Sequence, residues 1–140
     1  MKILVAIDGS DCSQRALSYV LEHTSLFGTA PERTLINVHR PIPSARAKAW
    51  VGHDVVEQYY KEEAELALGS ARALLAKNQR TAAELLKIGE PGQEVAAAAN
   101  HGFDLIVMGT KGRTGLANLL MGSAATSALA ESKVPVLLVK

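Results

Sequence analysis

Five short apolar runs, separated by segments with helical periodicity, constrain the fold of this chain most strongly. The first run, KILVAID at residues 2–8, is continuous and ends in a charge, which is typical of a strand buried on both faces of a parallel sheet. Further strands are expected at residues 33–40, 81–89, 103–109 and 134–140. Helices are expected between them, at residues 9–28, 53–79, 90–102 and 122–132. This alternation predicts an α/β fold in which helices cover both faces of an open parallel sheet.

The chain length and the balance of charges narrow the class of protein. With 140 residues and no repeat or linker, the chain fits a single domain, residues 1–140. Fifteen basic residues face fourteen acidic ones and aromatic residues make up 4%, which argues against a dedicated nucleic-acid or membrane partner. Cys12 is the single cysteine, which suits a reducing compartment, and the first apolar run is too short for a signal peptide. We therefore expect a cytoplasmic protein.

A glycine-rich stretch, MGTKGRTGLANLLMGS at residues 108–123, follows the fourth apolar run. It matches neither the P-loop nor the dinucleotide fingerprint G-x-G-x-x-G. Glycines nevertheless let backbone amides approach an anion, and a helix expected to begin near Ser123 would add its free N–H groups. Lys111 and Arg113 can neutralise phosphate charge. A purely structural turn explains the same residues equally well, with residues 114–121 forming a short helical turn on the body of the domain.

A second candidate region lies where the first strand ends. Ligands of open α/β sheets bind beyond the carboxyl ends of the strands, at the point where the strand order reverses. If the first strand neighbours the second and the fourth, Asp8 and Gly109 face one crevice. Asp8 can bind a ribose hydroxyl or a divalent cation, or it can cap the following helix. Val38, at the end of the second strand, can offer its backbone N–H and C=O groups to a planar base.

The spacing G-x2-G-x9-G-S formed by Gly109, Gly112, Gly122 and Ser123 resembles the ATP-binding signature of the universal stress protein family. The blocks KILVAIDGS, GFDLIVMGTKGRTGL and LLMGSAATSALAESKVPVLLVK extend the resemblance over the whole chain. The resemblance implies a doubly wound, Rossmann-like sheet with strand order 3-2-1-4-5. It also implies the ATP-binding branch of the family and a homodimer formed through residues 134–139.

Carried over position by position, the resemblance implies a set of nucleotide-binding residues. They are Asp8, Gly9, Val38, Met108, Gly109, Gly112, Arg113, Gly122, Ser123 and Ala124. Asp8 would contact the ribose or a Mg²⁺ ion that accompanies ATP. Many relatives carry a proline beside this aspartate, whereas Gly9 follows it here, so the chain departs from the family pattern at this corner.

Three functions are compatible with these residues. The first is an ATP-binding regulator of a stress response, the second a slow ATPase or adenylyl-transferring enzyme, and the third a protein-interaction module with a structural glycine loop. Hydrolysis needs a base or a water-positioning group near the γ-phosphate, and the glycine-rich stretch contains no carboxylate. No catalytic residue is therefore expected, and ATP hydrolysis would be weak at most.

Glu62, Glu63 and Glu65 are interpreted as a solvated helix face, and residues 41–52 as a loop able to close over a nucleotide.

Overall fold

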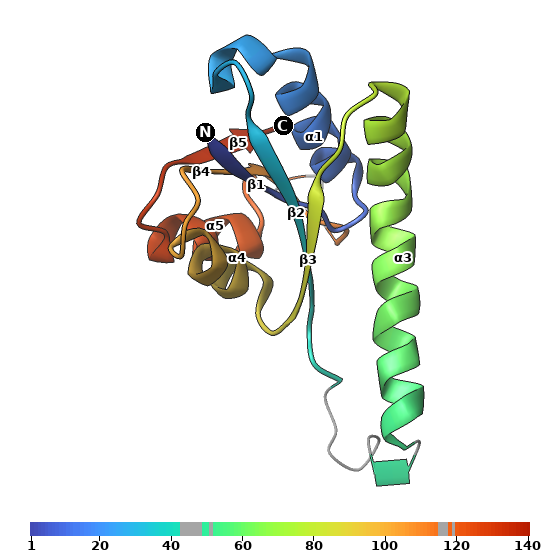
Figure 1. Ribbon diagram of the computed structural model, residues 1–140. Helices are drawn as coiled ribbons and strands as arrows, with labels where there is room; N and C mark the ends of the chain where they lie inside the picture. Colours follow the sequence, from blue (N-terminus) through green and yellow to red (C-terminus); the bar gives the residue numbers. More distant parts are fainter. Residues whose placement is uncertain (43–48, 51, 115–117, 119) are drawn as a thin grey trace.

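A parallel five-stranded sheet with the order β3-β2-β1-β4-β5 forms the centre of the computed structural model, which describes residues 1–42, 49–50, 52–114, 118 and 120–140 (Figure 1). The strands are β1 (Lys2–Ala6), β2 (Glu32–His39), β3 (Ala83–Ile88), β4 (Leu105–Gly109) and β5 (Val136–Val139). The α/β class and the strand order 3-2-1-4-5 are thus confirmed. Because β1 pairs with both β2 and β4, the strand order reverses between β1 and β4.

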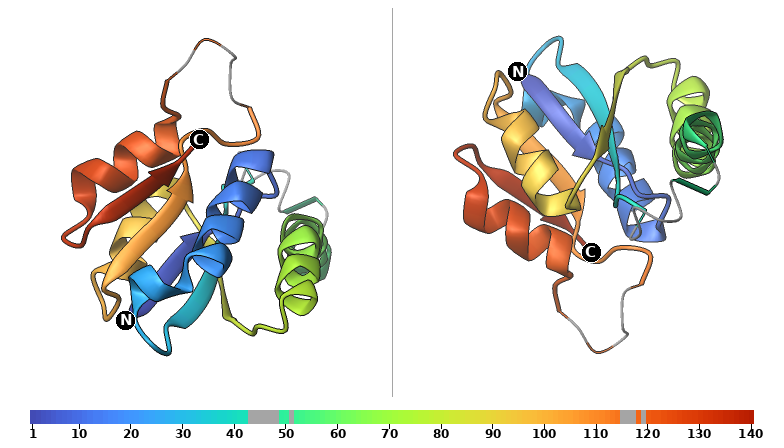
Figure 2. Two further views of the ribbon diagram at one scale, coloured as in Figure 1. Left: turned by 90° about the horizontal axis from the view of Figure 1, so that it is seen from above. Right: turned by 90° about the horizontal axis from the view of Figure 1, so that it is seen from below.

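Helices cover both faces of this sheet, with α1 (Asp11–Glu22) and α3 (His53–Lys77) on one face and α4 (Pro91–Ala99) and α5 (Ser123–Glu131) on the other (Figures 1 and 2). The single helix expected over residues 9–28 is divided, because α1 ends at Glu22 and a 3₁₀ turn follows at Thr24–Phe27. Helix α1 begins only at Asp11, since Ser10 is its N-cap and accepts a hydrogen bond from the Ser13 N–H.

Two apolar clusters fill the space between the sheet and its helices. On the α1 and α3 side, Ile3 and Val5 of β1 pack with Leu17 and Val20 of α1 and with Leu68 of α3. On the α4 and α5 side, the core cluster is built from Leu4, Ile36, Val95, Ile106, Met108 and Ala128. Adjacent residues of β1 point to opposite faces, so the continuous apolar run of the first strand serves both clusters.

Helix α3 packs on the sheet more loosely than its length suggests. Three of its five buried residues are alanines, Ala64, Ala67 and Ala71, and its amino-terminal half extends past the sheet (Figure 1). Farther along the helix, Arg72 forms ion pairs with Glu65 on the same helix and with Glu84 on β3. The carboxyl-terminal half of α3 is therefore attached by charges as well as by apolar packing.

Two sequence expectations fall partly outside the described residues. Residues 43–48 and 51 belong to the loop expected at 41–52, and residues 115–117 and 119 to the helical turn expected at 114–121. Within the loop expected at 41–52, Trp50 is described and is 90% exposed. In the described part of the chain, no helix combines the length and apolar character needed to cross a membrane.

Candidate functional site at the carboxyl ends of β1 and β4

The carboxylate of Asp8 joins the end of β1 to the loop that follows β4. One of its oxygens accepts a hydrogen bond from the Ser10 N–H at 2.9 Å, and the other accepts one from the Arg113 N–H at 3.2 Å. Asp8 and Arg113 are 105 residues apart in the sequence. The two segments that the sequence placed at one crevice are therefore in contact, at the reversal of strand order where ligands of such sheets bind.

Asp8 is not the cap of α1, which was one of its possible roles. Ser10 performs that function, with its Oγ 3.2 Å from the Ser13 nitrogen. Gly9, between Asp8 and Ser10, has a φ of +83°, a backbone conformation that favours glycine. A Cβ built on Gly9 would lie 3.2 Å from the Cα of Ala67, so the turn after β1 also lies directly against α3.

The packing of the protein leaves no room for a side chain at Gly109 and little room for one at Gly112. A Cβ on Gly109 would lie 2.6 Å from the Cβ of Cys12 and 2.9 Å from the Cys12 carbonyl carbon, because the first turn of α1 crosses the end of β4 there. A Cβ on Gly112 would lie 2.9 Å from a carboxylate oxygen of Asp8. The space on the Cβ side of Gly109 therefore holds the first turn of α1, and its role in nucleotide binding stays a prediction.

Gly122 differs from these two glycines. Its φ of −80° and ψ of 166° are extended values open to any residue, and a Cβ there would have only ordinary contacts, the nearest at 3.4 Å from the Thr110 oxygen. The Gly122 N–H donates to that same oxygen at 2.7 Å, which joins the two ends of the loop over residues 110–122. Nothing in the described neighbourhood of Gly122 requires a glycine.

Helix α5 begins directly after this closure, with exposed Ser123 in its first turn. The first N–H groups of a helix have no acceptor within it, so the amides of Ser123, Ala124 and Ala125 are available at this end. Gly122, as N-cap, supplies no side-chain acceptor for them. Ala124 also fixes the helix in place, because its carbonyl lies so close to Gly92 of α4 that a side chain on Gly92 would clash with it.

Backbone groups of Val38 face the same region from β2. Pairing between β1 and β2 ends at Ala6 and Ile36, and the Ile7 N–H takes the Ile36 oxygen. Since backbone groups alternate in direction along a strand, those of Val38 turn to the β1 side just beyond that last pair. Met108, in contrast, lies in the core with 5% of its surface exposed, so only its backbone can line a ligand.

Three polar residues near the ends of β1 and β2 have surroundings that the sequence did not predict. Glu63 of α3 has a carboxylate oxygen 3.7 Å from Arg113 Nη1, and its side chain is 27% exposed, so it does not belong to a solvated face. Burial lowers the pKa of His39 at the end of β2, with Glu63 acting in the opposite direction and Arg113 in the same one. Asn37, fully buried on β2, donates its amide to the Ile7 oxygen at 2.7 Å.

Helical spacing contained a signal for Glu63. It lies one residue before Ala64 and four before Ala67, both on the buried stripe of α3, so it borders the packed face rather than the outer one. Asn37 stands inside an apolar strand run, where nothing in the sequence marks it as a partner of the Ile7 carbonyl.

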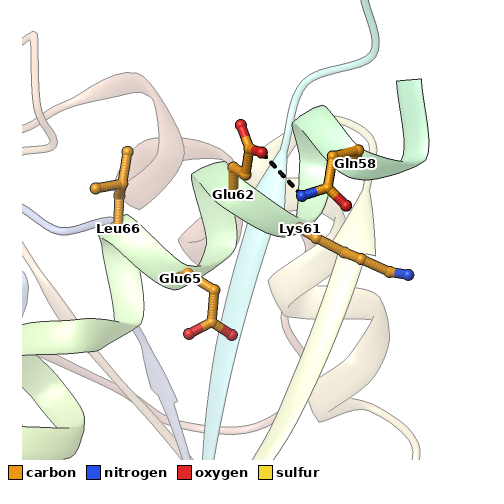
Figure 3. A pocket seen from close by; sticks show the side chains of 5 residues that line it. All are labelled: Gln58, Lys61, Glu62, Glu65 and Leu66. Atoms are coloured by element: carbon orange, nitrogen blue, oxygen red, sulfur yellow. Dashed lines mark hydrogen bonds between the residues drawn. The ribbon is translucent and has the colours of Figure 1, made fainter. Parts of the chain in front are cut away.

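The shallow hollow drawn in Figure 3 lies elsewhere, on α3. It is lined by Gln58, Lys61, Glu62, Glu65 and Leu66, and none of the expected nucleotide residues is among them. Leu66 is 75% exposed at its edge. Among the described residues, no group of three or more His, Cys, Asp or Glu side chains could hold a metal ion, so Asp8 stands as a single carboxylate.

Known proteins with similar sequences and folds cover nearly the whole chain. A universal stress protein of Thermus aquaticus is 32% identical over 142 residues, covering 99% of this chain and 97% of the relative. The structure of MJ0577 from Methanocaldococcus jannaschii is similar with a TM-score of 0.79 at 28% identity, covering 99% of this chain and 94% of that one.

Two more distant structures share the fold and were solved with nucleotides. One is a universal stress protein in complex with cAMP, with a TM-score of 0.66, 23% identity, and coverage of 100% and 97%. The other is a protein of Arabidopsis thaliana with AMP bound, with a TM-score of 0.66, 16% identity, and coverage of 100% and 91%. The model of the universal stress protein family matches residues 1–140, and the chain belongs to that family.

Proposed function

We propose that the region at the carboxyl ends of β1 and β4 binds an adenine nucleotide, with ATP as its ligand, and that the protein is a nucleotide-dependent regulator in a stress response. The observation that carries this proposal is the contact between the Asp8 carboxylate and the Arg113 N–H. It brings the end of β1 onto the G-x2-G-x9-G-S loop at the reversal of strand order. The cAMP and AMP bound by two structural neighbours support a nucleotide as the class of ligand.

The base and the phosphates would occupy different parts of this region. The backbone N–H and C=O of Val38 would pair with adenine, because β2 continues beyond its last pair with β1. The phosphates would lie at the start of α5, where the amides of its first turn, the Ser123 hydroxyl and the cations Lys111 and Arg113 surround them. A site with two cations and a helix amino terminus favours a polyphosphate over a monophosphate.

Asp8 fits the role of one ligand to a Mg²⁺ ion carried by ATP. Mg²⁺ in nucleotide sites is bound by one or two carboxylates, by water and by the phosphates themselves, so a single carboxylate suffices. In the free protein the Asp8 carboxylate accepts two backbone N–H groups. Release of the Arg113 N–H would leave one oxygen for the metal or for a ribose hydroxyl.

Calorimetric titration with ATP, AMP and adenosine tests this proposal on the wild-type chain and on Gly122→Val. The structure has room for a side chain at Gly122, so the variant should fold and yet lose most of its ATP affinity, because the valine would occupy phosphate space. Ser123→Ala should lose less, at most about 1.5–3 kcal/mol, since it removes one hydroxyl and keeps the amides.

Circular dichroism and the thermal midpoint serve as the folding control for both variants. Wild-type ATP affinity in a folded Gly122→Val protein would mean that the loop is structural. The interaction-module hypothesis would then become the preferred one.

A further inference from the structure

Arg113 is held by carboxylates from two different elements. Its backbone N–H donates to Asp8 at the end of β1, and its guanidinium lies 3.7 Å from Glu63 of α3. The Arg113 side chain is 60% exposed, so it is accessible to a ligand, whereas that of Glu63 is 27% exposed. The cation expected to meet phosphate is therefore already paired in the free protein.

The neighbours of Glu63 on the helix have other partners. Glu62 accepts a hydrogen bond from Gln58 at 2.8 Å on the outer face of α3, as Figure 3 shows. Glu65 pairs with Arg72, which in turn binds Glu84. Within this acidic run, Glu63 is thus the carboxylate paired with Arg113.

We propose that Glu63 is a specificity-determining residue of the nucleotide site, because its carboxylate competes with ligand phosphate for Arg113. This inference rests on the proposed function. Glu63 opposes binding in proportion to the negative charge that the ligand brings to Arg113, so it acts on ATP more than on AMP and leaves adenosine unaffected. It also links the phosphate site to α3, since a phosphate that takes Arg113 releases Glu63 and one of the attachments of that helix.

The packing between α3 and the sheet is weak enough for a contact between Glu63 and Arg113 to affect how the helix is held. Three of the five side chains that α3 buries are alanines, so its apolar packing depends mainly on Leu68 and Leu75. On β2, the buried Asn37 Oδ1 and His39 Nε2 have no hydrogen-bond partner among the described residues. Polar atoms left without partners weaken an interface, so the ion pairs of Glu63 and Arg72 add to a limited apolar attachment of α3.

Titrations at constant ionic strength with ATP, AMP, adenosine and inorganic tripolyphosphate test this inference. Glu63→Gln should raise the affinity for ATP and tripolyphosphate by roughly two- to fivefold, the range of an exposed ion pair, and leave that for adenosine unchanged. Glu62→Gln is the matched control, since it removes the same charge from the adjacent position and should change none of these affinities. In an Arg113→Gln background, Glu63→Gln should no longer have an effect.

Several results would overturn the inference. Equal effects of Glu63→Gln and Glu62→Gln on ATP affinity would show a general electrostatic effect of α3 rather than competition for Arg113. A gain in ATP affinity that persists without Arg113 would point to another partner of Glu63. A loss of ATP affinity in Glu63→Gln would mean that Glu63 contributes to binding. In each of these cases wild-type binding of ATP leaves the proposed function standing. If neither the wild type nor Glu63→Gln binds ATP or tripolyphosphate, both proposals fail.

Discussion

At the residue scale, Gly109 is required by the packing of α1 on β4. Gly109→Val should destabilise the fold whether or not nucleotide is present, because its Cβ would lie 2.6 Å from that of Cys12. We expect a loss of at least about 1–3 kcal/mol in the free energy of unfolding, the usual cost of overpacking a core. Chemical denaturation of the free protein measures it.

Gly69→Ala is the control for this prediction. No atom lies within 4 Å of a Cβ built there, in the middle of α3, so the change should stabilise the protein by about 0.5–1 kcal/mol. A Gly109→Val protein as stable as wild type would show that α1 and β4 are farther apart than described.

His39 should make stability depend on pH. Burial lowers its pKa from the ordinary value of 6.5, so the unfolded chain binds the proton more tightly than the folded protein does. The free energy of unfolding should therefore fall as the pH drops from 6.5 through the lowered folded-state pKa. Thermal midpoints across this range should show a shallower pH dependence in His39→Gln, and the same dependence as in wild type would exclude His39 as its origin.

The residues of the site were only partly predictable from the sequence. The meeting of Asp8 with the glycine loop followed from the order of the strands, which the family resemblance implied. The pairing of Arg113 with Glu63 did not, because it depends on how α3 lies across the sheet, and that is set by tertiary packing. The sequence also did not show why residue 109 is a glycine, because the cause is the position of α1 rather than the loop itself.

At the scale of elements, the attachment of α3 to β3 should depend on Arg72. The hydrogen bonds that Arg72 donates to Glu84 and Glu65 raise the pKa of Arg72, and the bond from Arg72 lowers the pKa of Glu84. Arg72→Gln should cost at most about 1 kcal/mol, because these ion pairs are partly exposed, but it should speed hydrogen exchange in the carboxyl-terminal half of α3. High salt should reduce the difference between variant and wild type.

Lys61→Gln removes a positive charge from the same helix and should leave that exchange unchanged. Equal exchange in wild type and Arg72→Gln would mean that apolar packing alone, through Leu68 and Leu75, holds this half of α3.

Types of elements were easier to predict than their ends. The continuous apolar runs of β1 and β4 and the alternation of strands and helices were enough for the class, whereas the strand order came from the family resemblance. The helix expected over residues 9–28 ends at Glu22 instead, because the chain turns at His23, whose φ of −111° and ψ of 40° are not helical. Such a break depends on packing at the end of the helix, to which the periodicity of the sequence is insensitive.

At the scale of the whole molecule, β5 is an edge of the sheet, as expected. The Ile106 N–H donates to the Pro135 oxygen and the Thr110 N–H to the Val139 oxygen. Backbone groups of the alternate residues, Val136 and Leu138, therefore point to the free edge, where they can pair with a second copy of the strand around a two-fold axis.

Val136→Pro should abolish a dimer formed in this way. Proline removes the outward N–H and no bond to β4, and edge strands tolerate it. Val136→Ala keeps the N–H and should remain dimeric. Sedimentation velocity at micromolar concentration distinguishes the two. A monomeric wild type would contradict pairing through β5, and a dimer that survives Val136→Pro with the fold intact would place the interface elsewhere.

The position of β1 has a consequence for synthesis on the ribosome. This strand is made first, yet it lies in the middle of the sheet and pairs with β4 through residues 105–107. After β2 emerges, a nascent chain must wait for the 65 residues between His39 and Leu105, roughly 3–13 s at about 5–20 residues per second. During that interval the apolar edge of β1 stays open and can pair with the wrong strand.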